Sequence, residues 1–398
     1  MKPPARQPEI ECFDALVIGA GPAGSAAALQ LARRGRRVLL VDRARFPRHK
    51  VCGGCVNPAA IDVLTSLGLG DRLNRLHARP TRALRLCTGR TSSTIALSGG
   101  VAISRQAFDQ ALVDEAIAAG VTFRDGCSAT LQPDTSGHIR SVLLLHDQHT
   151  TTVHANIILA CAGLDARLLE GERDLPLKIA RRSHMGVSAI ATDVNAAYEP
   201  GVIHMVHGKG GYVGLVRIET GALDIAAALS PAFVKKQGGP AGAVEAILRS
   251  AHQPAIDSLH ALDWQGTPLL SRRRTRVASH RLFVLGDAAG YVEPFTGEGI
   301  AWALASAQAC APIADAAIDA WSDAHAAAWN QTHHRLLAAR QRRCRWLTRA
   351  LRWRPLVGLA NRVLRWAPAL ARPLVRSIQA SWQSVAPPEP SLIKGEAR

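Results

Sequence analysis

The sequence predicts an α/β protein in which a parallel, nucleotide-binding sheet is interrupted by a mostly antiparallel sheet and followed by a helical C-terminal segment. A strand, a glycine turn, a helix and a second strand succeed one another between Ala15 and Asp42. Segments rich in β-forming residues fill 181–275, and a second strand–loop–helix pattern begins at His280. The expected boundaries are 12–180 and 276–325 for the two parts of the nucleotide-binding domain, 181–275 for the inserted sheet and 326–385 for the C-terminal segment.

The N-terminal stretch has the pattern of a Rossmann-type dinucleotide-binding unit. Its apolar runs, Ala15–Ile18 and Val38–Val41, are the expected strands, and three glycines lie between them in the spacing G-x-G-x-x-G. The first glycine allows a sharp turn, the second lets a pyrophosphate approach the backbone, and the third lets the helix pack close to the sheet. The helix N-terminus offers free N–H groups to the phosphates. The predicted ligand contacts are Gly19, Gly21, Pro22, Ala23 and Gly24.

The end of the second strand narrows the choice of nucleotide. Asp42 lies where a carboxylate can accept hydrogen bonds from a ribose, and Arg43 follows it. Because a carboxylate repels a 2′-phosphate, Asp42 predicts FAD or NAD rather than NADP.

A second glycine-rich stretch separates FAD from NAD. The predicted strand Leu282–Leu285 runs into Gly286 and Asp287, and a loop with Gly297 and Gly299 leads into an apolar helix. A carboxylate at a strand end can hold a polyol, while the nearby helix N-terminus faces a ring or a phosphate. This arrangement suits the ribityl chain of a flavin. Together the two stretches predict FAD in a two-part site.

The loop after Asp42 contains Cys52 and Cys55 in a C-x-x-C pattern, with His49 nearby. A zinc site is not favoured, because no second ligand pair has suitable spacing, and no metal is predicted. A redox-active pair is the second alternative, although the context is not thioredoxin-like. The preferred interpretation is a glycine loop close to the flavin, whose thiols line the site or pack against it.

Two further positions are candidates for the site. Arg105 opens a predicted helix, where it could equally be a solvated residue of the first turn. Tyr212 lies in a predicted strand of the inserted sheet, which is expected to cap the cofactor and form the substrate pocket. It could contact the substrate, although an aromatic residue in a strand is more often part of the core.

Four motifs occur in order along residues 12–310. They are the glycine fingerprint, K-V-C-G-G at Lys50–Gly54, S-R-x-x-F-D at Ser104–Asp109, and G-D-A-A-G with P-x-x-G-E-G at Gly286–Gly299. Together they resemble the geranylgeranyl reductase family, which belongs to the FAD-dependent oxidoreductases with the para-hydroxybenzoate hydroxylase fold.

The resemblance implies roles for individual residues. The fingerprint glycines and Asp42 would hold the ADP part of FAD, and Arg105 would lie near the cofactor. Asp287 would bind the ribityl or pyrophosphate region, and the loop 297–299 would approach the isoalloxazine. Cys52 matches the cysteine that the reductases place beside the flavin.

The chain departs from its relatives at two motifs that bear on the reaction. The aromatic hydroxylases carry an A-D-G motif, where this chain reads Ala162-Gly163-Leu164-Asp165, which argues against a standard NADPH-dependent hydroxylase. The reductases carry Y-x-W-x-F-P, of which only Tyr212 remains, which argues against a long prenyl substrate. The G-x-W-x-I-P segment of flavin-dependent halogenases does not occur in the sequence.

The charge of the chain is concentrated near its C-terminus. The 398 residues carry a net charge of +17, and residues 331–376 contain twelve arginines and no acidic residue. On a helix over Gln341–Trp353, leucines lie opposite an arginine face and tryptophans lie at the border, as in a helix at a membrane interface. The members of this pattern are Arg342, Arg345, Arg349 and Arg352 on one face, Leu347 and Leu351 on the other, and Trp346 and Trp353 between them.

An ordinary terminal helix with a solvated arginine face fits this pattern equally well. Nucleic acid is not predicted as a partner, because the sequence contains no recognised nucleic-acid module. Scattered cysteines and the lack of a secretory signal favour the cytoplasm, with peripheral attachment to the inner face of the membrane as the alternative to a free protein.

The sequence therefore predicts an FAD-dependent oxidoreductase that draws electrons from NAD(P)H or a reduced carrier. The preferred reaction is reduction of a carbon–carbon double bond in an apolar small molecule, with a proton supplied by Cys52 or Cys55. One alternative is an oxygen-using hydroxylase or epoxidase of an aromatic or polyketide-like compound. The other is a flavin-binding, membrane-associated protein without turnover.

Overall fold

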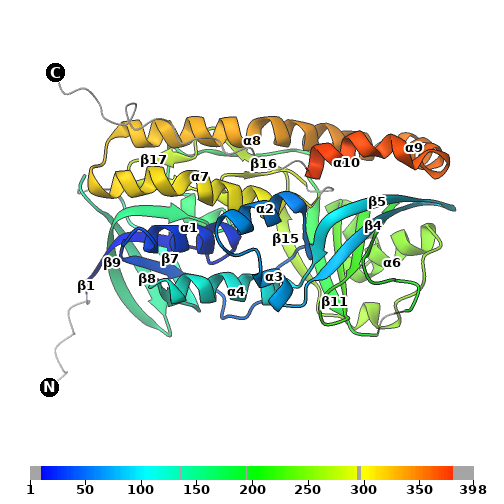
Figure 1. The fold of residues 1–398 in the computed structure, drawn as a ribbon, viewed down its shortest axis with the longest axis horizontal. Helices are drawn as coiled ribbons and strands as arrows, with labels where there is room; N and C mark the ends of the chain where they lie inside the picture. Colours follow the sequence, from blue (N-terminus) through cyan, green and yellow to red (C-terminus); the bar gives the residue numbers. More distant parts are fainter. Residues whose placement is uncertain (1–9, 135–136, 194, 294–296, 380–398) are drawn as a thin grey trace.

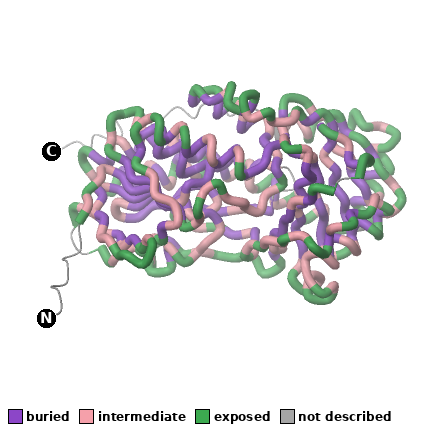
Figure 2. Tube along the Cα trace, turned by 90° about the horizontal axis from the view of Figure 1, so that it is seen from below, coloured by how far each residue is buried: buried purple, intermediate pink, exposed green. Residues whose placement is uncertain are grey.

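A computed structural model describes residues 10–134, 137–193, 195–293 and 297–379. Two large β-sheets lie one after the other along the long axis, and helices α7 (Gly299–Asp319) and α8 (Asp323–Leu351) run along one side (Figure 1). Buried residues concentrate in two regions, one around each sheet (Figure 2). The predicted α/β class is confirmed.

The first sheet is the predicted nucleotide-binding sheet. Its order is β17-β18-β9-β1-β2-β6, and β8 joins β9 and carries β7. The central pairs β1–β2, β1–β9 and β9–β18 are parallel. The strands are β1 (Ile10–Ile18), β2 (Val38–Val41), β6 (Thr122–Arg124), β7 (Cys127–Leu131), β8 (Arg140–His146), β9 (His149–Ala160), β17 (Ala278–Ser279) and β18 (Leu282–Val284).

Parallel pairing brings the carboxyl ends of these strands to one edge, where open α/β sheets bind their ligands. The residues Gly19, Asp42, Cys161 and Gly286 follow β1, β2, β9 and β18 there, although they are far apart in the chain. Helices α1 (Pro22–Ala32) and α4 (Arg105–Ala118) begin close to the same edge. The two glycine-rich stretches thus meet because the strands that precede them share one sheet.

The second sheet has the order β15-β11-β14-β13-β12-β4-β5-β3. All its pairs are antiparallel except β4–β12, which is parallel. The strands are β3 (Cys55–Val56), β4 (Arg79–Thr88), β5 (Thr91–Ala102), β11 (Met185–Ala191), β12 (Val202–Gly208), β13 (Gly211–Arg217), β14 (Leu223–Leu229) and β15 (Gln265–Leu269).

This sheet differs from the predicted insertion in one respect. Strands β3, β4 and β5, from residues 55–102, were assigned to the first part of the nucleotide-binding domain, but they pair with the inserted strands through β4–β12. Local sequence identifies a strand by its pattern, but it does not specify a pairing partner over a hundred residues away. The second sheet is therefore built from two segments of the chain, one before and one after the first-sheet strands β6–β9.

The remaining elements connect or cover the sheets. A small third sheet joins β10 (Leu177–Ile179), β16 (Arg272–Arg274) and β19 (Gly290–Tyr291). The other helices are α2 (Pro58–Ser66), α3 (Arg72–Arg75), α5 (Pro231–Lys236), α6 (Pro240–Ser250) and the short turns η1 (Arg167–Leu169), η2 (Asp257–His260) and η3 (Gly286–Ala288).

The C-terminal segment folds back onto the second sheet. Helix α8 is followed by α9 (Arg354–Trp366), η4 (Pro368–Ala371) and α10 (Arg372–Gln379). Helix α9 lies over β5, where the fully buried Asn361 accepts a hydrogen bond from the Ser93 hydroxyl at 2.5 Å and donates one to the Thr91 carbonyl at 2.9 Å. None of the described helices is long and apolar enough to cross a membrane.

The leucine face predicted for the end of α8 does not face outward. Leu347 and Leu351 are half-buried and line an internal cavity. The sequence could not show that the chain after α8 would fold back so that this face lines a cavity. The exposed aliphatic side chains of this segment belong to α9, η4 and α10, whereas α8 exposes Trp346.

The fingerprint glycines allow α1 to pack unusually close to the sheet, so substitution of Gly24 should be costly. A Cβ on Gly24 would lie 1.9 Å from the Gly19 carbonyl oxygen and 3.2 Å from the Cys161 Cβ. We expect Gly24→Ala to lower the free energy of unfolding by about 1–3 kcal/mol, the usual cost of overpacking, as measured by chemical denaturation.

The matched control is Gly358→Ala in α9, because a Cβ there meets no atom within 4 Å. Alanine favours a helix over glycine, so this variant should gain up to about 1 kcal/mol. Equal stability of the two variants would contradict the close approach.

Candidate functional site

A single large cavity connects the carboxyl edge of the first sheet with the C-terminal helices. Its volume is about 1870 Å³, above the roughly 300–1,000 Å³ of ordinary small-molecule sites. One end is polar and is formed around Gly19, Asp42, Arg105 and Asp287. The other end is apolar and lies beneath α9 and α10. The cavity therefore has room for a nucleotide cofactor and an extended apolar molecule together.

Every predicted site residue except Gly24 lines this cavity. Gly24 packs behind the turn against the Gly19 carbonyl, as expected for a residue that brings the helix close to the sheet. Arg43 is exposed on one side and pairs with Asp165. The structure brings the remaining predicted contacts together; they are Gly19, Gly21, Pro22, Ala23, Asp42, Cys52, Cys55, Arg105, Tyr212, Gly286, Asp287, Gly297 and Gly299.

Three cations converge on the glycine turn. A Cβ on Gly21 would lie 3.7 Å from an Arg48 nitrogen, 3.8 Å from Lys50 Nζ and 3.9 Å from an Arg105 nitrogen. The N-terminus of α1 points to the same place, with Pro22 in its first turn. Backbone N–H groups and three positive side chains around a glycine form an anion site. Its charge and position suit the pyrophosphate of a dinucleotide.

Asp42 is held by the backbone of the turn. Its Oδ2 accepts a hydrogen bond from Ala20 N at 2.8 Å, and its Oδ1 accepts one from Ala44 N at 2.9 Å. Arg48 approaches the same carboxylate at 3.5 Å. Because each carboxylate oxygen has a second lone pair, Asp42 can still accept a ribose hydroxyl. Its position agrees with the ribose role predicted from the sequence.

The cationic cluster is organised by a buried acid. Arg105 donates to both carboxylate oxygens of Asp109 at 2.9 and 2.7 Å, and Arg48 pairs with the same carboxylate at 3.0 Å. Burial alone would lower the pKa of Arg105, but Asp109 and the neighbouring Cys52 outweigh it and raise that pKa. The guanidinium therefore stays charged beside the cavity and is not a solvated surface group.

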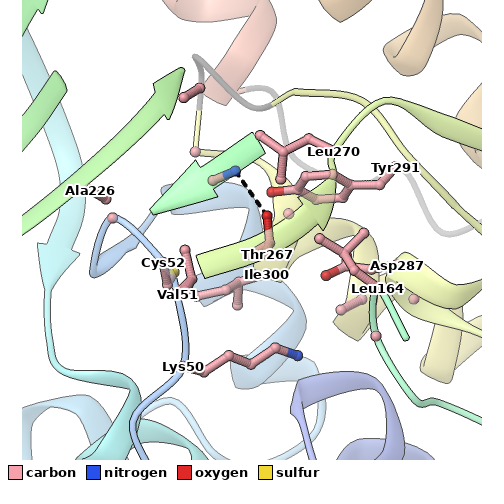
Figure 3. Close-up of a pocket in the computed structure, with 18 of the residues that line it drawn as sticks. Lys50, Val51, Cys52, Leu164, Ala226, Thr267, Leu270, Asp287, Tyr291 and Ile300 are labelled. Atoms are coloured by element: carbon pink, nitrogen blue, oxygen red, sulfur yellow. Dashed lines mark hydrogen bonds between the residues drawn. The ribbon is translucent and has the colours of Figure 1, made fainter. Parts of the chain in front are cut away.

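Lys50 and Asp287 face the cavity from opposite sides (Figure 3). Burial lowers the pKa of the Lys50 ammonium, and the nearby Arg105 lowers it further, whereas Asp287 opposes this shift. Burial raises the pKa of Asp287, against the attraction of Lys50 and Arg105. The sequence motif K-V-C-G-G contains Lys50, but sequence reasoning assigned no role to this cation.

The two cysteines of the C-x-x-C loop are free thiols. A Cβ on Gly297 would lie 3.9 Å from Cys55 Cβ, so this cysteine faces the loop predicted to approach the isoalloxazine. Burial raises the pKa of the Cys55 thiol, and Cys52 and Asp224 raise it further, so Cys55 is a neutral thiol at neutral pH. Cys52 lies beside Arg105 and also lines the cavity.

Asp224 of β14 is a buried acid that the sequence analysis missed. Gly54 lies between the two cysteines in the sequence, and a Cβ added to it would lie 2.7 Å from Asp224 Oδ2. The Oδ1 of Asp224 is buried without a hydrogen-bond partner in the described part of the chain. Burial raises the pKa of Asp224 to about 8, Glu219 raises it and Arg105 lowers it. The sequence signal that could have identified Asp224 is that it is the single acidic residue in the otherwise apolar stretch Leu223–Leu229.

Tyr212 forms part of the cavity wall where the two ends meet. It is 7% exposed and packs in a cluster with Leu86, Met205 and Leu270. Burial raises the pKa of its hydroxyl, and Glu293 beside it raises it further. Tyr212 is thus both a core residue and a cavity residue, which unites the two alternatives that the sequence left open.

Comparison with known proteins identifies the family. The model of the family described as FAD binding domain matches residues 12–314, and the chain belongs to this family. It is therefore an FAD-dependent protein of the superfamily that contains oxidoreductases, monooxygenases and halogenases. The residues of the polar end fit FAD: the cations at Gly21 suit its pyrophosphate, Asp42 its ribose and Asp287 its ribityl chain.

Several relatives with known names share parts of the sequence. The chain is 57% identical to a menaquinone reductase of Mycobacterium tuberculosis over 60 residues, which span 15% of either chain. It is 26% identical to a geranylgeranyl diphosphate reductase of Rhodobacter capsulatus over 321 residues, covering 76% of this chain and 75% of that one. A digeranylgeranylglycerophospholipid reductase of Thermoplasma volcanium is 23% identical and covers 78% and 80%.

Solved structures confirm the fold. A flavin-dependent brominase superposes with a TM-score of 0.75 at 15% identity, covering 92% of this chain and 93% of that one. A flavin-dependent halogenase superposes with a TM-score of 0.70 at 20% identity, covering 82% and 62%. At such identities the likeness concerns the fold and not the reaction.

Removal of the acid at the ribityl position should release the cofactor. Asp287→Ala deletes a hydrogen-bond acceptor. It also removes the negative charge that Lys50, Arg105 and Arg272 share. We expect wild-type protein to be yellow, and the variant to lose most of its flavin absorbance relative to protein absorbance after gel filtration. Asp114→Ala on the exposed side of α4 is the control for a lost surface acid. A yellow, folded Asp287→Ala protein would contradict the assignment.

Proposed function

We propose that the protein reduces a carbon–carbon double bond in a long apolar substrate, such as an isoprenoid chain. The observation that carries the proposal is the cavity, which continues from the flavin end into an apolar chamber. Its walls come from β4, β5 and β12 and include Leu84, Leu86, Ile95, Leu97, Ile203 and Met205. A chamber of this kind excludes water and holds an apolar chain by burial, at roughly 25 cal/mol per Å² of covered surface.

The names of three relatives support a reductase that acts on lipids. A menaquinone reductase, a geranylgeranyl diphosphate reductase and a digeranylgeranylglycerophospholipid reductase all resemble this chain. All three are reductases by name, and the names of two of them contain a geranylgeranyl group. Taken from the sequence alone, the departure from Y-x-W-x-F-P argues against a long prenyl substrate. The cavity offsets this argument, because its aliphatic lining supplies apolar contacts in place of the missing aromatic segment.

The reaction adds a hydride and a proton across the double bond. When bound, FAD supplies the hydride after reduction by NAD(P)H or another carrier. The chain must supply the proton, and we assign this to the Cys55 thiol, which faces the flavin loop. Asp224 lies close enough to raise the pKa of the Cys55 thiol, its Oδ2 lies beside Gly54, and it is protonated below about pH 8. The Sγ–H proton passes to the substrate carbon, the Asp224 carboxyl returns a proton to the sulfur, and water then reprotonates Asp224.

Oxygen insertion is the alternative reaction. A squalene monooxygenase of Eremothecium gossypii is 38% identical over 69 residues, which cover 17% of this chain. The same apolar chamber could hold a substrate for such a reaction. The products separate the two possibilities.

Product mass decides the reaction class. We expect FAD-loaded protein, supplied with dithionite under anaerobic conditions, to add two hydrogen atoms to a geranylgeranyl-bearing lipid, as detected by mass spectrometry. The Asp287→Ala variant is the control without cofactor. A product that gains one oxygen atom, formed only in air, would establish a monooxygenase and overturn the reductase.

Asp224→Asn tests the proton source. The wild-type rate should fall above about pH 8, because Asp224 then loses the proton that it returns to Cys55. Asparagine holds no such proton, so kcat should fall at least about a hundredfold, roughly the smallest effect of a general acid. The fall in the pH–rate profile near pH 8 should also disappear. FAD content should stay at the wild-type level, and Asp114→Asn should keep the wild-type profile. An unchanged profile in Asp224→Asn would exclude this acid.

The same acid predicts a pH dependence of stability. Its pKa is raised from 3.8 to about 8 in the folded state, so between these values the folded protein binds a proton that the unfolded chain does not. Wild-type stability should therefore fall as the pH rises across this interval, relative to Asp224→Asn. Urea denaturation at about pH 5 and about pH 8.5 measures the difference. A constant difference between the two proteins would contradict the raised pKa.

A further inference from the structure

The apolar side chains at the mouth of the cavity lie on the protein surface. Leu359, Val363, Leu370 and Leu374 are 59%, 43%, 64% and 49% exposed, and all four also line the cavity. They come from α9, η4 and α10, which lie together at one end of the molecule (Figure 1). The apolar chamber thus opens through a rim that is itself apolar. We call this rim, together with Leu356 and Trp366, the mouth surface.

Exposed tryptophans belong to the same C-terminal segment as the mouth surface. Trp366 is 86% exposed, Trp353 at the start of α9 is 63% exposed, and Trp346 near the end of α8 is 69% exposed. Large aromatic residues are costly to expose to water, but they are favoured where an apolar phase meets an aqueous one. Their exposure indicates that this end of the molecule meets such a boundary.

The charge around the mouth surface has one sign. Between Ala324 and Pro388 the sequence has no acidic residue. Arg362, Arg365, Arg372 and Arg376 are exposed on α9 and α10, and within the described residues none of them takes part in an ion pair with a carboxylate. They lie within a helical turn or two of the apolar rim, so their field reaches whatever the rim contacts. The complementary surface is anionic.

The mouth surface is rigidly connected to the flavin end. Arg352, at the end of α8, pairs with Glu293 at 3.2 Å, and Cys344 donates to Glu298 at 3.0 Å. Glu293 and Glu298 belong to the stretch between β19 and α7, which contains the predicted isoalloxazine loop. Asn361 fixes α9 on β5. The exposed apolar residues are therefore part of the folded core structure and not a loose end.

We propose that the mouth surface docks on an anionic lipid bilayer, and that the apolar substrate enters the cavity directly from the acyl chains. Substrate would move from one apolar phase into another without crossing water. The inference rests on the proposed function only for the apolar nature of the substrate. It assigns the bilayer contact to α9, η4 and α10, and not to the leucine face of α8 that the sequence suggested, because those leucines lie inside the cavity.

A second copy of the chain is a poorer occupant. A two-fold contact would place the arginines of one mouth surface against those of the other, because both partners of an isologous interface use the same patch. Like charges in such a contact oppose association. An anionic bilayer satisfies both the apolar rim and the arginines around it.

The test is sedimentation of the full-length, FAD-loaded protein with vesicles. We expect strong binding to vesicles containing phosphatidylglycerol and weak binding to pure phosphatidylcholine, with the difference reduced by salt. A basic residue near an anionic membrane contributes about 1 kcal/mol, which is about fivefold in affinity. The variant with Arg362, Arg365, Arg372 and Arg376 changed to Gln should therefore bind on the order of several hundredfold more weakly. Changing Lys235 and Lys236 of α5 to Gln, which do not line the cavity, should have a much smaller effect.

Apolar insertion requires its own variant. Changing Leu359, Val363 and Leu370 to Ser should weaken binding at least tenfold, whereas Ile117→Ser and Leu145→Ser, at exposed apolar positions elsewhere, should not. Lipids with brominated acyl chains should quench tryptophan fluorescence, and Trp366→Phe should reduce that quenching. Binding that ignores the serine changes, or quenching that ignores Trp366→Phe, would overturn the docking.

Two further outcomes would also overturn the docking. Equal binding to both kinds of vesicle would show that the surface does not recognise anionic lipid. A change in oligomeric state in the serine variant, with unchanged vesicle binding, would assign the mouth surface to a second copy of the chain. None of these measurements depends on catalytic turnover. The docking proposal can therefore fail or hold independently of the proposed reductase activity.

Discussion

The close approach of the glycine turn to the end of β9 is the constraint on which the rest of the site depends. Gly19 adopts a positive φ of 105°, and a Cβ there would lie 2.4 Å from the Cys161 carbonyl oxygen. Only because both Gly19 and Gly24 lack side chains can α1 begin at the sheet edge, with its free N–H groups directed toward the cavity. The cations gathered around Gly21 then complete an anion site that suits a pyrophosphate, and Asp109 keeps two of them in place.

From that fixed point the cavity extends in one direction. The flavin end is rigid and charged, whereas the chamber beyond Tyr212 is lined by aliphatic residues and ends at the C-terminal helices. Glu293 connects the two regions, since it contacts Tyr212 on one side and Arg352 of α8 on the other. Buried charges of this kind contribute little net stability but fix the relative positions of the elements that hold them. The polar end of the cavity and the C-terminal helices are thereby held in a fixed relation.

Local sequence patterns predicted most of the first sheet and many of the residues that line the polar end of the cavity. The glycine spacing, Asp42 and Gly286-Asp287 each report a backbone requirement that few other residues meet, so they can be recognised without knowledge of the fold. The partners of β4 and the direction of Leu347 could not be predicted, because both depend on contacts between segments far apart in the chain. Asp224 was missed because a single acid in an apolar strand has meaning only once its neighbours are known.

The central claim is that an apolar substrate in this cavity accepts the electrons of the reduced cofactor. Stopped-flow spectroscopy tests it most directly: chemically reduced protein is mixed with an anaerobic dispersion of an isoprenoid lipid, and separately with air-saturated buffer. The account predicts that the lipid restores the absorbance of oxidised flavin without oxygen, and that air alone does so slowly and in one phase. Reoxidation that requires oxygen and passes through a transient spectral species would contradict it and establish an oxygen-using enzyme.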